Sequence, residues 1–289
     1  MSDTASIGND EITVTVAALG AETQSLMTRD GREWMWDGDA AFWTGRAPIL
    51  FPIVGKSPDD VLNINGADYP MNQHGFARRT VFELIEQSPE DVRYQLTANQ
   101  ETLKVYPFDF VLTVTHSVEG KTLTVSSTVT NYGASDMPFQ FGYHPAFLWP
   151  LPGADADDTH FVTLKNGAEP ALVRVREALL DLTPQPSPFR DGVLELKHDY
   201  FEVDALVFPE GAGDTITFRA ENGPSLSFTF ENLPNLALWQ KPGAPYLCVE
   251  PWHGMAAEFG KGRDMTDRPY VQSLGPGETQ TFTFSVTID

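Results

Sequence analysis

Residues Tyr246–His253 read YLCVEPWH and show, in eight positions, the pattern that recurs through the chain. The first five residues alternate as in a β-strand, so that Tyr246, Cys248 and Glu250 share one face. Pro251 has no backbone N–H to donate to a neighbouring strand and is expected to end this one. Glu250 would then be the last side chain before the backbone leaves the sheet. Because protein chemistry is common at the rims of rigid sheets, Glu250 is a candidate functional residue.

Segments with the same alternation are spread over the whole sequence. Gly, Pro, Asn and Asp residues separate them, and no helical period is sustained, with residues 99–103 as one short helical candidate. This pattern predicts an all-β protein, a large antiparallel β-sandwich. The expected strands are 11–17, 21–28, 33–36, 80–85, 92–97, 110–118, 122–130, 137–143, 205–208, 215–219, 225–230, 236–240, 246–250 and 281–288.

Two segments rich in proline are expected to interrupt the regular structure. Residues 46–55 (RAPILFPIVG) carry Pro48 and Pro52, so neither a helix nor a central strand can extend over the whole segment. Residues 183–189 (TPQPSPF) preclude regular structure and suggest a long crossing connection. Because the sequence has no linker, low-complexity tract or clear repeat, we predict that residues 1–289 form a single domain.

The composition excludes several classes of partner. With 19 Lys and Arg against 40 Asp and Glu, the 289-residue chain has a formal charge of -21, which repels nucleic acid and anionic lipid. A local basic pocket for an anion is still compatible with this total. The single cysteine, Cys248, precludes an internal disulfide and favours a reducing compartment, with secretion without disulfides as the weaker alternative. The N-terminus shows no signal-peptide pattern, and no window reaches the roughly 18–20 apolar residues of a spanning helix, so we expect a cytoplasmic protein.

Three polar residues stand next to conformationally special neighbours: His74 before Gly75, His144 before a proline, and Glu250 before Pro251. A carboxylate and two imidazoles can supply a general base and a general acid near neutral pH. Metal ligation is the competing chemistry for such a set. Because these residues show no short ligand spacing such as HxH or HExxH, no metal site is predicted.

Nearly the whole chain resembles the aldose 1-epimerase (galactose mutarotase-like) family, in particular its LacX-type branch. The similarity consists of motifs in the order of the family. These are RAPILFPIVG from Arg46, NQHGFAR with His74, PFQFGYHPAF with His144, EVDALVF with Asp204, LALWQKPG from Leu236, YLCVEPWHG with Glu250, and LGPGE from Leu274.

The resemblance implies a large β-sandwich whose concave face holds one aldose, with no metal or organic cofactor. In the family, the residue matching Glu250 takes the proton of the anomeric hydroxyl, and the one matching His144 protonates the ring oxygen. The ring opens, the aldehyde carbon rotates, and closure gives the other anomer. The residues matching His74, Arg46 and Asp204 orient the sugar.

The residue types suit this chemistry at their ordinary pKa values. A glutamate of pKa about 4.3 is ionised at pH 7, whereas a histidine of pKa about 6.5 can carry a proton. A positioned pair of this kind replaces bimolecular buffer catalysis. In addition, an indole such as that of Trp252 or Trp239 could stack on the C–H face of the pyranose.

The hypothesis is therefore a cofactor-independent isomerase that interconverts the anomers of a free hexose. One alternative is a hexose-6-phosphate 1-epimerase, suggested by Arg78 in HGFAR. This alternative requires a second arginine close to Arg78, which by itself is expected to form a surface ion pair in so acidic a protein. The other alternative is a carbohydrate-binding sandwich without catalysis. The sequence leaves open which sugar is bound and whether the protein is a monomer or a homodimer.

Other potentially reactive side chains are given structural roles. His116 falls on an apolar strand face and is expected to be packed in the core. Cys248 is expected to be packed and not nucleophilic, because no basic neighbour in sequence would lower its pKa. His253 is predicted to line the site without taking part in the chemistry. No role is assigned to His160 or His198.

Overall fold

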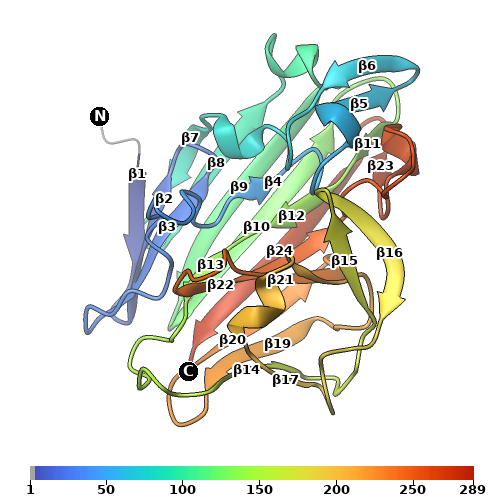
Figure 1. The fold of residues 1–289 in the computed structure, drawn as a ribbon. Coiled ribbons are helices and arrows are strands. Elements are labelled where there is room, and N and C mark those ends of the chain that lie inside the picture. Colours follow the sequence, from blue (N-terminus) through green and yellow to red (C-terminus); the bar gives the residue numbers. More distant parts are fainter. Residues whose placement is uncertain (1–3) are drawn as a thin grey trace.

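The computed structural model describes residues 4–289, and β-strands form most of its regular structure (Figure 1). The largest sheet has nine strands. In spatial order these are β17 (Val193–Glu195), β14 (His160–Leu164), β19 (Thr215–Ala220), β20 (Ser225–Glu231), β24 (Thr279–Ile288), β10 (Thr122–Asn131), β9 (Phe110–Glu119), β8 (Asp91–Thr97) and β7 (Glu83–Gln87).

The second large sheet carries the candidate functional residues. Its strands, in order, are β16 (Leu179–Gln185), β15 (Leu172–Arg176), β18 (Leu206–Phe208), β21 (Asn235–Trp239), β22 (Tyr246–His253), β12 (Phe141–Tyr143) and β4 (Ile49–Leu50), and β13 (Ala146–Leu148) also pairs with β22. Figure 1 shows this sheet lying over the nine-stranded one. The all-β sandwich predicted from the sequence is thus confirmed.

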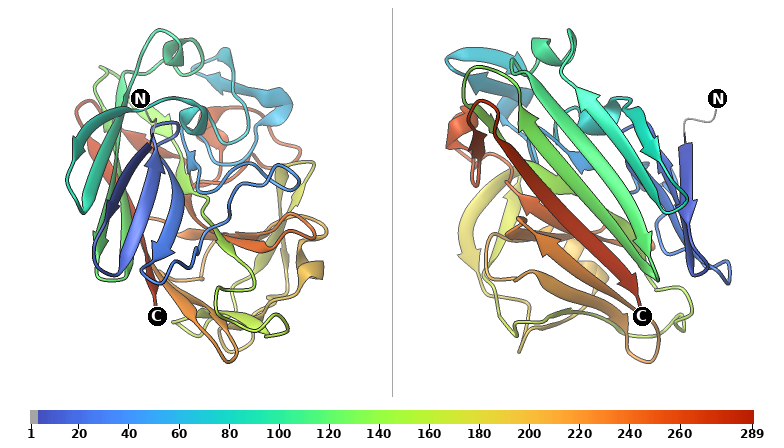
Figure 2. Two further views of the ribbon diagram at one scale, coloured as in Figure 1. Left: turned by 90° about the vertical axis from the view of Figure 1, so that its left-hand side faces the viewer. Right: turned by 180° about the vertical axis from the view of Figure 1, so that it is seen from behind.

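Smaller elements complete the fold. A three-stranded sheet of β1 (Thr4–Gly8), β2 (Ile12–Ala17) and β3 (Glu22–Thr28) lies at one side of the molecule, where β1 contacts β8 and β9 (Figure 2). Two-stranded sheets pair β5 (Val61–Ile64) with β6 (Ala67–Pro70), and β11 (Met137–Phe139) with β23 (Gln272–Leu274). The 3₁₀ helices are η1 (Pro58–Asp60), η2 (Ala77–Arg79), η3 (Thr102–Lys104), η4 (His198–Phe201) and η5 (Met265–Asp267). Within residues 4–289, no helix has the length and apolar character needed to cross a bilayer.

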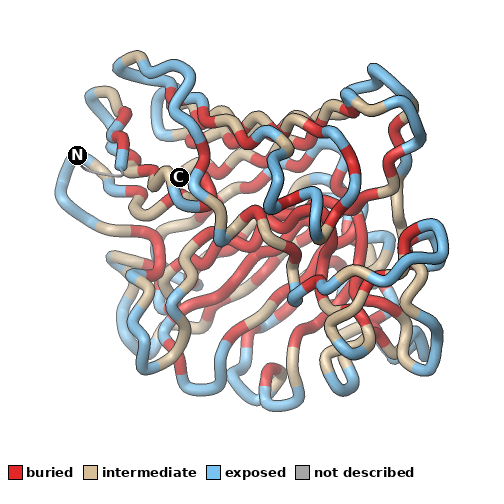
Figure 3. Tube along the Cα trace, turned by 90° about the horizontal axis from the view of Figure 1, so that it is seen from above, coloured by how far each residue is buried: buried red, intermediate tan, exposed pale blue. Residues whose placement is uncertain are grey.

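The two large sheets differ in how their faces are covered. In the nine-stranded sheet, β9, β10 and β24 alternate between buried and partly exposed residues, because one face packs inward and the other meets solvent. In β22, seven successive residues are buried, so both faces of this strand are covered. Figure 3 shows the buried residues gathered through the middle of the molecule. One apolar cluster extends from Ala5 to Ile288, which supports our proposal that the chain folds as one domain.

The prediction that Pro251 ends its strand is wrong, because β22 continues to His253 and Pro251 pairs with Leu236 of β21. Val249, two residues earlier, donates its N–H to the carbonyl of Pro145 on the other side. By the alternation of the strand, the N–H that Pro251 lacks would point to that same side. There β12 gives way to β13, so the missing donor falls at a break in the neighbouring strand. Glu250 therefore lies inside a central strand and not at a rim.

Three other predicted segments also differ from the structure. The segment predicted to preclude regular structure begins within β16, which includes Pro184. The strand tolerates this proline because β16 is at an edge of its sheet, where a missing N–H breaks no ladder. The strand predicted over residues 137–143 is divided at Gln140 into β11 and β12. Residues 33–36 form isolated bridges in place of the predicted strand.

Candidate active site

Glu250 stands on the face of β22 that points away from the nine-stranded sheet. Leu247 and Val249, on the opposite face, belong to the main core cluster, whereas Tyr246, Cys248 and Trp252 belong to two smaller clusters. The Glu250 side chain is buried, and Ala237 of β21 is its cross-strand neighbour. The strand thus presents Cys248, Glu250 and Trp252 to one side, as the sequence alternation predicted for the first two.

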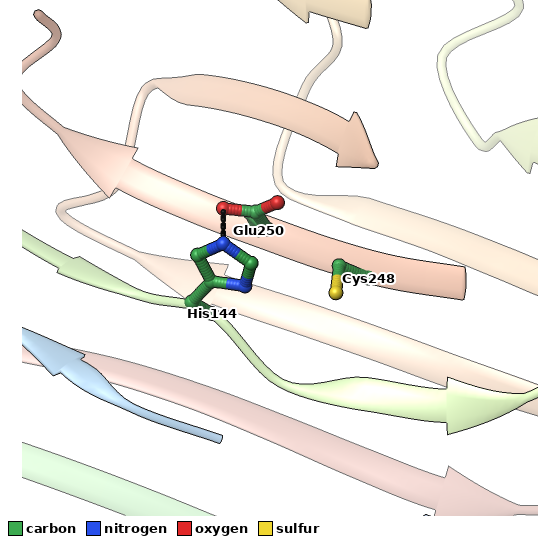
Figure 4. A group of neighbouring side chains, drawn as sticks. All are labelled: His144, Cys248 and Glu250. Atoms are coloured by element: carbon green, nitrogen blue, oxygen red, sulfur yellow. Dashed lines mark ion pairs between the residues drawn. The ribbon is translucent and has the colours of Figure 1, made fainter. Parts of the chain in front are cut away.

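His144 reaches Glu250 from the gap between β12 and β13. The N–H of His144 donates to the carbonyl of Pro48, and Pro145 accepts from Val249 of β22. These contacts hold the chain against β22 while the ladder is interrupted. As a result, His144 Nε2 lies 3.1 Å from Glu250 Oε2 (Figure 4).

Three rings enclose the imidazole of His144. The Trp43 ring lies 4.9 Å away and is tilted, at an interplanar angle of 31°. The rings of Trp239 and His74 meet it edge to face at 5.7 Å and 5.6 Å. This aromatic box restricts the rotamers of His144 without donating a hydrogen bond to its Nδ1.

The His144–Glu250 pair lines a cavity of about 560 Å³, a size typical of small-molecule sites. Loops and strands from eight separate parts of the chain form its walls. The lining residues are Trp43, Gly55, Gln73, His74, Arg78, His144, Val175, Ala178, Leu180, Phe201, Glu202, Val203, Asp204, Ala205, Val207, Trp239, Lys241, Pro242, Glu250, Trp252, Met255 and Ala256.

Buried polar atoms without a hydrogen-bond partner are concentrated in this cavity. Within residues 4–289, six buried side-chain nitrogen or oxygen atoms make no hydrogen bond, and four of them belong to lining residues: Arg78 Nε, His144 Nδ1, Trp252 Nε1 and Glu250 Oε2, whose 3.1 Å contact with His144 Nε2 lacks hydrogen-bond geometry. An unsatisfied buried polar group costs about 1–3 kcal/mol, so such groups are rare unless they serve a ligand. The cavity is therefore arranged for a polar molecule.

Burial changes the acid–base properties of the pair. It raises the pKa of the Glu250 carboxyl well above its usual range, and the nearby Asp204 carboxylate adds to the rise. Burial also lowers the pKa of the His144 imidazole to about 3. The ordinary pKa values assumed from the sequence are therefore wrong for both groups. Each is pushed toward its neutral form, because charge is poorly solvated in this enclosed site.

His74 is fixed in one tautomer by the backbone of Gly55. The Gly55 N–H donates to His74 Nδ1 at 3.1 Å, and the His74 N–H donates to the Gly55 carbonyl at 2.8 Å. Burial, followed by the neighbouring His144, lowers the His74 pKa well below its ordinary value. A neutral ring whose Nδ1 accepts carries its proton on Nε2, which lies 3.2 Å from the side-chain amide of Gln73 at the cavity wall.

Gly75 permits the close backbone approach expected from the sequence. It has a φ of +72°, and a Cβ at this position would lie 2.1 Å from the carbonyl oxygen of Phe51. The loop can therefore pack directly on the segment that precedes Gly55. This packing brings His74 to the cavity wall.

Asp204 and Trp252 also line the cavity, as expected of residues predicted to bind the sugar. Asp204 has a φ of +143°, and its Oδ1 accepts from the N–H of Ala205. Such a backbone is strained for a side chain other than glycine, and strain of this kind is frequent at functional sites. Trp252 packs closely on Gly142, where a Cβ would meet its ring at 2.5 Å.

The two arginines of the sequence prediction are placed contrary to expectation. Arg46 is not among the lining residues, and its Nη1 donates to the carbonyl of Gln24 at 2.7 Å. Its predicted sugar contact stays a prediction that this placement does not favour. Arg78 was expected in a surface ion pair, but it lines the cavity, and its Nη2 donates to the carbonyl of Gln73 at 3.2 Å. Sequence alone offers no means to choose between the two, since the path of the intervening loop decides which arginine faces the cavity.

Arg268 supports the cavity from behind and was missed in the sequence. It is buried, and its five guanidinium N–H groups are all used. The acceptors are Gln140 Oε1, the carbonyls of Val54, Lys56 and Met255, and Ser57 Oγ. Because its acceptors are mostly backbone carbonyls, no sequence motif announces this role. Arg268 joins the loop of Gly55 to the loop of Met255.

The remaining histidines and the cysteine lie outside the cavity lining. His253 was expected to line the site, but its Nδ1 meets the carbonyl of Asn232 and its ring contacts Phe282, so it faces the other sheet. His116 is buried in the core, as predicted. Burial raises the pKa of the Cys248 thiol well above its ordinary value, which agrees with the prediction that it is not nucleophilic.

Comparisons with known proteins place this geometry in context. The family model described as aldose 1-epimerase matches residues 3–266. The chain is 30% identical to the chromosomal LacX protein of Lactococcus lactis subsp. lactis, with 99% of each sequence covered. The structure resembles a galactose mutarotase related enzyme from Lactobacillus acidophilus (TM-score 0.93, 29% identity, 99% of this chain and 97% of that one). It is also similar to a galactose mutarotase-like protein from Lactobacillus casei (TM-score 0.92, 30% identity, 99% and 100% covered). The chain belongs to the aldose 1-epimerase family.

Proposed function

We propose that this protein is an aldose 1-epimerase that interconverts the α and β anomers of a free hexose by general acid–base catalysis. The observation that carries the proposal is the contact between His144 Nε2 and Glu250 Oε2, 3.1 Å apart at a cavity with four unpartnered polar atoms. Two proton-transferring groups this close can act on two oxygens attached to the same carbon. The anomeric hydroxyl and the ring oxygen of an aldose are such a pair.

The reaction needs one proton held by the pair. Burial alone favours this proton on Glu250, because both side chains are then neutral. A bound sugar whose anomeric hydroxyl donates to Glu250, and whose ring oxygen accepts from His144, instead stabilises the form with the proton on His144 Nε2. The two protonation states differ only in which side chain holds the proton, and binding of the sugar favours the reactive state, with the proton on His144.

In the forward direction, Glu250 takes the proton of the anomeric hydroxyl while the bond between the anomeric carbon and the ring oxygen breaks. The ring oxygen takes the proton from His144 Nε2, which leaves a neutral imidazole, a protonated carboxyl and an open-chain aldehyde. After rotation of the aldehyde, closure reverses each transfer and forms the other anomer. No net proton is gained or lost.

The other lining residues fit the binding of sugar hydroxyls. Trp252 offers a buried Nε1–H without a partner among the described residues, Asp204 offers a carboxylate acceptor, and His74 presents its Nε2 beside the side-chain amide of Gln73. Trp43 and Trp239 present ring surface to a C–H face. These groups would hold the sugar with its anomeric carbon at the His144–Glu250 pair.

The cations of the cavity favour an uncharged hexose over a hexose 6-phosphate. Among the described lining residues, Arg78 is the one arginine and Lys241 the one lysine. Arg268 uses all of its donors on neutral acceptors of the protein. The second arginine that a phosphate-binding cavity would require next to Arg78 is thus not provided by the lining residues.

The test is the mutarotation of freshly dissolved α-D-glucose and α-D-galactose, followed by polarimetry or NMR. Loss of Glu250 as a base in Glu250→Gln should lower the rate by about 10²–10⁴-fold. The matched control is Glu119→Gln, an exposed carboxylate at the end of β9, which should turn over like the wild type. Equal rates for wild type and Glu250→Gln would refute the mechanism. Sugar-dependent thermal stabilisation without any mutarotation would point to a binding protein, and faster turnover of glucose 6-phosphate would overturn the assignment of a free hexose.

A further inference from the structure

The buried thiol of Cys248 lies beside the His144–Glu250 pair and has no part in the proposed reaction. Cys248 precedes Glu250 by two residues on β22, so its side chain is on the same face of the strand. One ligand atom each from His144, Cys248 and Glu250 lie within 4.8 Å of one another, and all three residues are buried (Figure 4). His144 reaches this position from a segment about a hundred residues earlier, which is why no metal-binding spacing was visible in the sequence.

The ligand types suit a thiophilic divalent cation. Zn²⁺ binds thiolate at about 2.3 Å, and imidazole and carboxylate at about 2.0–2.2 Å, in a tetrahedron whose corners are therefore roughly 3.3–3.8 Å apart. Movements on the order of 1 Å would bring the three atoms into this arrangement. The fourth position would face the cavity, where water or a sugar hydroxyl can enter.

Two of these ligands already face each other in the buried site. Glu250 Oε2 lies 3.1 Å from His144 Nε2 and makes no hydrogen bond with any other group of the described residues, and the two side chains are only 2% and 10% exposed. Binding of the cation would release the thiol proton of Cys248 and the proton that the His144–Glu250 pair holds. A dication with one thiolate, one carboxylate and one neutral imidazole has no net charge, which is the state that a buried site tolerates best.

We propose that His144, Cys248 and Glu250 form an inhibitory site for a thiophilic divalent cation such as Zn²⁺. This inference rests on the proposed function, because the cation inhibits by occupying the lone pairs that transfer protons to and from the sugar. The site differs from a resident metal centre in one respect. Histidines of such centres donate their second ring nitrogen to an orienting partner, and His144 Nδ1 has none.

Binding is tested first, without sugar, so that the result does not depend on mutarotase activity. Co²⁺ added to the wild type should give the thiolate-to-cobalt charge-transfer absorption at one equivalent, and Zn²⁺ should displace it. In Cys248→Ala, the absorption should vanish and the Zn²⁺ affinity measured by calorimetry should fall at least about 100-fold, at or beyond the upper end of the 10–100-fold typical for loss of an outer-shell partner. The absence of the band in the wild type, or equal Zn²⁺ affinity in the two proteins, would overturn the proposal.

Inhibition is tested second, by mutarotation in metal-free buffer with added Zn²⁺. Zn²⁺ should inhibit the wild type, and a chelator should reverse this inhibition. Cys248→Ala should retain wild-type turnover without Zn²⁺ and should need at least tenfold more Zn²⁺ for half inhibition. Equal sensitivity of the two proteins would refute the role of the thiol in inhibition. If neither protein catalyses mutarotation, the proposed function fails, and the cobalt titration still decides whether the metal site exists.

Discussion

Replacing Arg268 by methionine tests how the cavity is supported, because the guanidinium joins the loop of Gly55 to the loop of Met255. In Arg268→Met, two groups lose the only hydrogen bond that they make within residues 4–289: the Val54 carbonyl and Ser57 Oγ. The other acceptors keep a second donor, since Lys56 O also accepts from Ala257 and Gln140 retains its own contacts. At about 1–3 kcal/mol for each orphaned group, the loss of unfolding free energy should be about 2–6 kcal/mol.

The buried charge itself reduces this loss. Burial lowers the pKa of Arg268 to about 9, so the group is still charged at neutral pH and its desolvation costs free energy in the wild type. Methionine removes that cost, so the lower half of the range, about 3 kcal/mol, is expected. Arg268→Lys would keep a charge but supplies three donors in place of five, and should also be destabilised.

Urea unfolding at pH 7 measures the stability, and ¹⁵N NMR of the imidazoles reports the tautomer of His74. If Arg268 holds the Gly55 loop, Arg268→Met should lower kcat and weaken the Nε2–H tautomer signal of His74 under conditions where the protein is still folded. Arg93→Met is the control, because its ion pair with Glu86 is exposed and should be worth less than about 1 kcal/mol. A change of less than about 0.5 kcal/mol in Arg268→Met, with an unchanged His74 spectrum, would refute the reasoning.

Three further predictions concern single residues. Burial lowers the pKa of His116 to about 3, so below pH 6.5 the unfolded chain binds a proton that the native state does not. Between pH 7 and pH 5, the free energy of unfolding measured in urea should therefore fall by about 2 kcal/mol more in the wild type than in His116→Leu. The control Ser117→Val should behave as the wild type. Gly75→Ala should lower the melting temperature markedly, because its Cβ would lie 2.1 Å from Phe51 O; a stable variant would contradict the packing of this loop. Trp252→Phe removes a buried N–H donor and should raise KM about tenfold at little cost in stability, whereas an unchanged KM would exclude the indole N–H from sugar binding.

The strands predicted best from sequence are those with one solvated face. In β9, β10 and β24, polar and apolar residues alternate because solvent meets every second side chain, and the predicted ranges differ from the structure by few residues. Strands of the other sheet are short or covered on both faces, so β4, β12 and β13 show no alternation to detect. Pro251 was misread for a related reason. The tolerance of a strand for proline depends on what its neighbour does, and that neighbour is more than a hundred residues away.

The residues of the candidate site, too, were predicted only in part from the sequence. Motifs identified Glu250, His144, His74 and Asp204, and the structure brings all four to one cavity. The choice between Arg46 and Arg78 depended on loop geometry. The role of Arg268 could not be predicted, because its acceptors are mostly backbone carbonyls, which carry no sequence signal. The pKa directions of Glu250 and His144 depended on burial, and they are opposite to what the ordinary values of isolated side chains would suggest.

The cost of the site explains why it is built on β22. The four unpartnered polar atoms of the cavity, at about 1–3 kcal/mol each, could together cancel much of the roughly 5–15 kcal/mol by which a protein of this size is stable. The compensation comes from the other face of the same strand, where Leu247 and Val249 pack into the main core cluster. Because side chains of a strand alternate, one backbone segment can hold Glu250 rigidly through apolar packing while leaving its carboxylate unsatisfied. A loop could present the same carboxylate, but it would have no buried face to hold it in place against that cost.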